Sequence, residues 1–116
     1  GPVAVAPAAE AQTDRCPGAV TQLDLTDCAA REYRDADADL NRVYRDVMSL
    51  AGARQERGLR EAQRAWLRFR DAHCAVEAAA YEGGSIQPMV RAFCLAGVTE
   101  QRADQLREML GRLRDR

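Results

Sequence analysis

The sequence contains no lysine, because all 17 of its basic residues are arginine. Schiff-base catalysis and Walker-type phosphate binding both need a lysine, so both chemistries are excluded. No apolar run approaches the roughly 20 residues of a membrane-spanning helix. A formal net charge of −1 excludes a uniformly basic nucleic-acid-binding protein. The 116 residues that carry these features have the size of one small domain.

Large apolar residues are also scarce, since much of the 47% hydrophobic content is alanine. Small domains with modest cores often need disulfide cross-links for stability, and the chain has four cysteines. They have no C-x-x-C spacing, which argues against zinc-ribbon and thioredoxin-like sites, and we expect no metal and no cofactor. Two disulfides in an exported protein are the preferred interpretation. Three pairings exist, and Cys16–Cys28 with Cys74–Cys94 closes the shortest loops.

The first 15 residues combine alanine, proline and small polar residues without an amphipathic period. We expect a disordered leader over 1–15 and a single helical domain over 16–116. Gly1-Pro2 matches the remnant of a protease-cleavage site and is left out of the fold argument. A removed secretory signal would leave a start of this kind, and whether a lipid anchor precedes Gly1 stays open.

The rest of the chain predicts an all-α fold, in which a small bundle of helices is cross-linked by disulfides. Two long antiparallel helices are expected, the first over about 21–51 and irregular before Cys28, the second from Leu59 to the glycines at 83–84. A short third helix capped by Ser85 and a C-terminal helix capped by Thr99 follow, separated by Gly97. On the second helix, spacing of three and four residues predicts one buried stripe: Leu59, Ala62, Trp66, Phe69, His73, Val76 and Ala80.

Some polar residues fall on the predicted core faces of the two long helices. A buried carboxylate needs a partner, and the planar guanidinium group of arginine suits it best. We therefore predict a buried contact between Asp37 and Arg70 that fixes helix register, completed by Asn41 or Gln63. Three acids lie on the opposite face of the first helix, where Arg31 and Arg42 are near enough for weak ion pairs, and we expect a solvated face: Glu32, Asp35 and Asp39.

Two features carry candidate chemistry. His73 adjoins Cys74, but neighbouring helix positions point about 100° apart, so a nucleophilic pair is disfavoured and we predict no catalytic residue. The Gly83-Gly84-Ser85 segment has two interpretations. Its glycines allow a close backbone approach to a partner, which suits a protruding recognition loop. A helix C-cap, a tight turn and an N-cap in succession explain the same residues, and the residues alone favour this second interpretation.

The chain resembles the LprI-type lysozyme inhibitor family of exported bacterial proteins over about residues 16–113. The most specific segment is AQRAWL-x-FRD-x-x-C, which ends at Cys74 and is followed by the GGS sequence at 83–85. Other matching positions are spread along the chain: Thr21-Gln22, Cys28-Ala29, Tyr33, Ala36-Asp37, Leu40-Asn41, Tyr44, Leu59-Arg60, Cys94, Thr99, Arg102 and Leu106.

The resemblance implies a periplasmic or secreted helical domain with disulfides that binds lysozyme and blocks its active-site cleft. The hypothetical contact residues are Gly83, Gly84, Ser85 and Ile86, and the acids Glu32, Asp35 and Asp39 would steer a basic lysozyme. One alternative is a periplasmic immunity protein against a secreted bacterial peptidoglycan hydrolase. Another is a structural or adaptor domain of the envelope. An enzyme is the least supported class.

Overall fold

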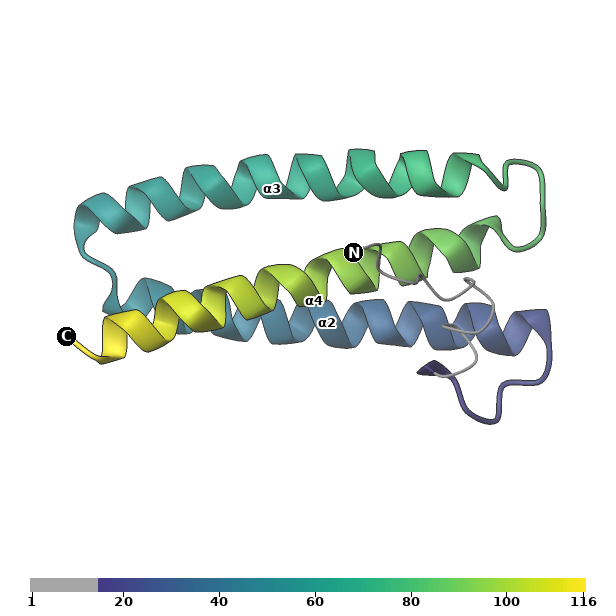
Figure 1. The fold of residues 1–116 in the computed structure, drawn as a ribbon, viewed down its shortest axis with the longest axis horizontal. Helices are drawn as coiled ribbons and strands as arrows, with labels where there is room; N and C mark the ends of the chain where they lie inside the picture. The colour runs from purple at the N-terminus through teal and green to yellow at the C-terminus, as the bar shows by residue number, and fades with distance from the viewer. Residues whose placement is uncertain (1–14) are drawn as a thin grey trace, which may run out of the picture.

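Three helices form the part of the protein that the computed structural model describes, residues 15–116. They are α2 (Gln22–Leu50), α3 (Ala53–Ala79) and α4 (Gln87–Arg114), and no strand occurs among these residues. Figure 1 shows that α2 and α4 run in the same direction. α3 runs in the opposite direction and connects the end of α2 to the start of α4. The all-helical class is therefore confirmed. Apart from Arg15, the predicted leader lies outside the described residues.

α2 is regular from its first residue, so the predicted irregularity before Cys28 is wrong. Thr21 caps the helix: its hydroxyl accepts a hydrogen bond from the backbone N–H of Asp24 at 3.0 Å. The Asp24 carboxylate accepts in turn from the backbone N–H groups of Thr21 and Val20, both at 3.2 Å. These bonds lower the pKa of the Asp24 carboxyl group. The capping box satisfies free N–H groups of the first turn, so the helix begins without fraying.

α3 begins earlier than predicted, at Ala53 instead of Leu59. The segment expected to be a connection is already helical, because Gly52 takes the N-cap position and its N–H donates to the Gln55 side chain at 3.4 Å. An ion pair between Glu56 and Arg60 supports the first turns. The helix ends at Ala79, a few residues before the predicted glycine stop.

α4 is one continuous helix where the sequence predicted two. Ser85 is not its cap; Ile86 takes that position and Pro88 stands in the first turn. Gly97 and Thr99 lie inside the helix, and Thr99 is completely buried. An interior glycine costs only about 1 kcal/mol. Packing of the whole length of α4 against α2 offsets that cost, so the expected break is absent.

The core lies between α2 and α4, which pack against each other over most of their length. Small residues such as Ala29, Ala96 and Ala103, each with no exposed surface, let the two backbones approach closely. The largest buried cluster fills the half of the bundle opposite the disulfides: Leu40, Val43, Val47, Leu59, Ala103, Leu106, Leu110 and Leu113. This packing gives a role to the buried alanines of α2 and α4.

α3 packs mainly on α4 and makes few contacts with α2. The predicted buried stripe on α3 is wrong in part. Phe69 is 57% exposed, Val76 is 74% exposed and His73 is exposed. The residues of α3 that are fully buried form a narrower strip, rotated from the predicted one: Leu59, Arg70, Cys74 and Ala78. Because α3 packs mainly on one neighbour, it needs only a narrow contact strip, and several of its other apolar residues stay exposed.

Both disulfides lie at the end of the bundle where α2 begins and α3 ends. Cys16 is bonded to Cys28 with a Cα–Cα distance of 6.1 Å, and Cys74 is bonded to Cys94 with a Cα–Cα distance of 5.6 Å. These are the pairs with the shortest loops. The first ties the segment before α2 to that helix, and the second ties α3 to α4.

Candidate functional site

The turn between α3 and α4, residues 80–86, is the most exposed connection in the described chain. Every residue from 80 to 85 is exposed, and Ile86 is half-buried. Internal hydrogen bonds still define its backbone: Gly84 N–H donates to the Tyr81 carbonyl at 2.9 Å, and Gln87 N–H donates to the Gly84 carbonyl at 3.3 Å. The Cys74–Cys94 disulfide joins the last turns of α3 to the first turns of α4, next to the turn. The turn is thus both exposed and conformationally restrained.

The two glycines of the turn have different roles. Gly83 has a φ of +81°, in the left-handed region that glycine adopts without strain. At Gly84, an added Cβ would lie 3.2 Å from the Tyr81 carbonyl oxygen, so a side chain there would press on the turn backbone. Gly83, Gly84 and Ser85 are all exposed. Figure 1 shows that the connection between α3 and α4 lies at one end of the bundle.

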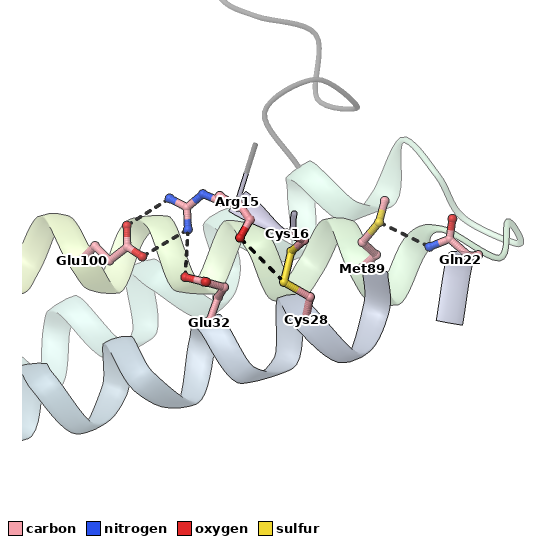
Figure 2. Close-up of a disulfide and its surroundings, with 7 residues drawn as sticks. All are labelled: Arg15, Cys16, Gln22, Cys28, Glu32, Met89 and Glu100. Atoms are coloured by element: carbon pink, nitrogen blue, oxygen red, sulfur yellow. Dashed lines mark hydrogen bonds and ion pairs between the residues drawn. A yellow bond between two sulfur atoms is a disulfide. The ribbon is translucent and has the colours of Figure 1, made fainter. Parts of the chain in front are cut away.

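The three candidate steering acids do not form one free acidic face. Glu32 lies 3.7 Å from Arg15, which also donates two hydrogen bonds to Glu100 of α4 at 3.0 and 3.1 Å (Figure 2). Asp39 accepts a hydrogen bond from Arg107 of α4. Within residues 15–116, only Asp35 of the three lacks an ion pair. Glu32 and Asp39 therefore help to join α2 to its neighbours.

Asp39 provides a testable pH dependence. The hydrogen bond from Arg107 lowers the pKa of the Asp39 carboxyl group. The unfolded chain, with an ordinary Asp pKa of about 3.9, therefore binds this proton more readily, and the stabilisation is present above that pH and lost as pH falls. We expect Asp39→Asn to cost about 0.2–1 kcal/mol at pH 7 and less at pH 3.

The measurement is urea unfolding between pH 7 and pH 3, with Asp35→Asn as the matched control. Asp35 lies on the same helix and has no ion pair within the described chain, so its variant should follow the wild-type pH profile. A D39N profile parallel to wild type would contradict the assignment.

Arg70 is the one buried charged residue of the described chain, with 7% of its surface exposed. Its guanidinium lies between two aromatic rings, 5.4 Å from the Tyr33 centroid and 5.3 Å from the Trp66 centroid. Its Nε donates to Asp71 at 3.0 Å, while Nη1 lies 3.9 Å from Asp37, an ion-pair distance without a hydrogen bond. Arg70 and Asp37 are thus close, but Arg70 makes its hydrogen bond to Asp71 of its own helix and lies between two aromatic rings.

The expected completion of this network does not occur. Gln63 accepts a hydrogen bond from Arg102 of α4 at 3.0 Å instead of bonding to Arg70. Asn41 is exposed and makes no side-chain hydrogen bond to any residue in 15–116. The physical reason is that α3 packs mainly on α4, where Arg102 is the hydrogen-bond partner within reach of Gln63.

His73 lies on the exposed face of α3. Its ring stacks on Phe69 with centroids 5.4 Å apart, and its Nε2 lies 3.7 Å from Glu77. The sulfur of Cys74 is held in a disulfide, so it does not serve as the nucleophile of a Cys–His pair. No group of three or more potential metal ligands occurs within residues 15–116. None of the helices in that range has the length and apolarity of a membrane span.

Comparison with known proteins decides the family. A family model described as "Lysozyme inhibitor LprI" matches residues 13–106. The chain belongs to the LprI family. The LprI chain is also 37% identical over 108 residues to an uncharacterized protein of Rhizobium meliloti (strain 1021), covering 82% of this chain and 78% of that protein. No solved structure matches it. The resemblance seen in the sequence is therefore confirmed.

Sequence reasoning missed one group of residues in this LprI protein. Arg102, Arg112 and Arg116 of α4 line the same cleft against α3. None of these arginines is among the site residues expected from the sequence. A helical wheel of the continuous α4 would have found them, since positions 102, 105, 109, 112 and 116 recur at steps of three and four. All these positions lie in the C-terminal helix expected after Thr99, but the sequence does not show that this face packs against α3.

Proposed function

We propose that the protein is an exported inhibitor that binds a lysozyme and inserts the turn at 80–86 into its active-site cleft. The family match supports lysozyme as the partner. The disulfides support an oxidising compartment outside the cytoplasm. The observation that carries the location of the site is the combination of exposure and restraint in this turn.

An inhibitor needs no catalytic group, but it loses affinity when binding orders a flexible segment. Here the backbone hydrogen bonds and the Cys74–Cys94 disulfide order the turn before any partner binds. Tyr81, Glu82 and Ser85 are exposed and offer an aromatic ring, a carboxylate and a hydroxyl group. These groups suit a cleft that binds carbohydrate.

Charge also favours this end of the bundle. The disulfide end, residues 15–31 and 71–94, carries five carboxylates and three arginines, whereas the remainder of the described chain carries an excess of arginine. A basic lysozyme would therefore be attracted to the end that presents the turn. This distribution replaces the face formed by Glu32, Asp35 and Asp39 as the proposed steering element.

The test is a turbidity assay, in which lysozyme clears a cell-wall suspension in the presence of the oxidised protein. We expect the wild type to slow clearing and the double variant Glu82→Arg/Ser85→Arg to need at least about tenfold more protein for the same effect, because a charge-reversed turn loses about 1.4 kcal/mol or more. Glu108→Arg is the matched control, since Glu108 is exposed on α4 far from the turn.

Each outcome bears on one part of the proposal. No slowing by the wild type at large molar excess rejects lysozyme inhibition. Slowing that E82R/S85R retains in full rejects the turn as the contact site. A panel that also contains bacterial peptidoglycan hydrolases would reject lysozyme as the target if only those enzymes are inhibited.

A further inference from the structure

A second surface lies at the opposite end of the bundle from the turn. It is a cleft of about 420 Å³ between the first half of α3 and the last part of α4, bordered by the end of α2. Apolar side chains form most of its lining: Val47, Ala51, Leu59, Ala62, Met109 and Leu113. The polar lining consists of Gln55 and the arginines at 102, 112 and 116, and no Asp or Glu lines the cleft. The cleft is thus apolar and cationic.

None of the three arginines of this cleft forms an ion pair with an Asp or Glu of residues 15–116, and several exposed arginines elsewhere are unpaired as well, so half-buried Arg102 is the distinctive one. Arg107 bonds to Asp39 and Arg60 bonds to Glu56, whereas Arg112 and Arg116 have no carboxylate within 4.0 Å in residues 15–116. A helix C-terminus favours nearby cations, which accounts in part for these two residues. It does not account for Arg102, which lies more than two turns earlier.

Arg102 is held in place by neutral groups. Its Nε donates to the Gln63 side chain at 3.0 Å, and its Nη1 donates to the Gln105 side chain at 3.0 Å. These amides orient the guanidinium but do not neutralise it, and burial lowers the pKa of Arg102. Partial burial of a cation without an anion is costly, and a bound anion would offset that cost. Nη2 makes no hydrogen bond within residues 15–116 and is free to donate to such an anion.

We propose that this cleft binds a single-chain anionic amphiphile, a molecule with one alkyl chain and one carboxylate or phosphate group. The alkyl chain would lie on the apolar lining, and the anionic group would accept hydrogen bonds from Arg102 and one or both terminal arginines. The cleft volume falls in the range of about 300–1,000 Å³ that is typical of small-molecule sites. The site is separate from the turn and does not depend on lysozyme binding.

The binding test uses calorimetric titration of the whole oxidised protein with twelve-carbon probes below their micellar concentrations. We expect laurate or dodecyl phosphate to bind at least about tenfold more tightly than dodecanol, a difference of about 1.4 kcal/mol. A third arm, lauroyl lysophosphatidylglycerol, separates the sources: tighter binding than laurate indicates a lipid head group, and weaker binding indicates a free fatty acid. Equal affinity for laurate, dodecyl phosphate and dodecanol, or no binding of any, would overturn the proposal.

Two variant pairs test the location of the site. Arg102→Gln should weaken laurate or dodecyl phosphate binding at least about tenfold, whereas Arg114→Gln, on the same helix but outside the cleft, should leave it unchanged. Gly58→Phe places a ring in the cleft, and Gly111→Phe is its control outside the cleft. An added Cβ at either glycine meets no atom within 4 Å, so both variants should fold, which circular dichroism checks. Equal losses within either pair would refute the assignment.

Discussion

Replacing Cys74 and Cys94 together by alanine is expected to lower the free energy of unfolding by about 3 kcal/mol. The disulfide closes a loop with a sequence separation of 20, and its removal frees many conformations of the unfolded chain. Cys74 has no exposed surface, so its loss also leaves unfilled space between α3 and α4. Urea unfolding followed by circular dichroism measures the change.

The same variant should weaken lysozyme inhibition, because the turn at 80–86 would lose the restraint beneath it. Cys16→Ala/Cys28→Ala is the matched control. Its loop has a sequence separation of 12, so the expected loss of stability is similar, about 3 kcal/mol. It should inhibit like wild type under conditions where both proteins are folded. Equal loss of inhibition by the two variants would refute a role for restraint of the turn.

Leu106→Ala is expected to destabilise the protein by about 3–4 kcal/mol, because it removes a completely buried side chain and leaves a cavity. Leu106 belongs to the cluster that α2 and α4 form with Leu40 and Val47. Phe69→Ala removes a larger apolar side chain but should cost less than about 1 kcal/mol, because 57% of Phe69 is exposed.

Thermal and urea unfolding of both variants compare the two faces directly. Leu50→Ala is a control for leucine removal, since Leu50 is 47% exposed at the end of α2. A cost for Phe69→Ala close to that of Leu106→Ala would mean that the exposed face of α3 is covered in solution, and it would contradict the described packing.

Helix caps and turn conformations could be predicted from the sequence because they depend on interactions between residues that are close in the chain. Thr21 and Asp24 form a capping box through atoms three residues apart, and the helix expected over about 21–51 begins at the same place. The left-handed φ at Gly83 follows from the same kind of short-range geometry. The family match rests on residue identities that do not require a structure.

Packing between helices that are distant in the sequence determined which residues of α3 are buried and whether α4 is continuous. Helical periodicity shows that α3 has apolar residues, but it does not show which of them contact another helix. The periodicity therefore predicted that Phe69 and Val76 are buried, whereas both are exposed in the fold. Gly97 and Thr99 carry local stop signals, and contact with α2 along the whole of α4 overrides them.

The candidate sites divide in the same way. The residues of the turn at 80–86 are adjacent in the chain, so their composition already marked an exposed connection. The cleft at the other end joins α3 to positions 102–116 of α4, and its lining becomes one group only when α3 packs against α4. Secondary structure and caps arise from interactions over a few residues, which a sequence displays. Burial and charge pairing arise from which helices meet, and only the folded chain sets that.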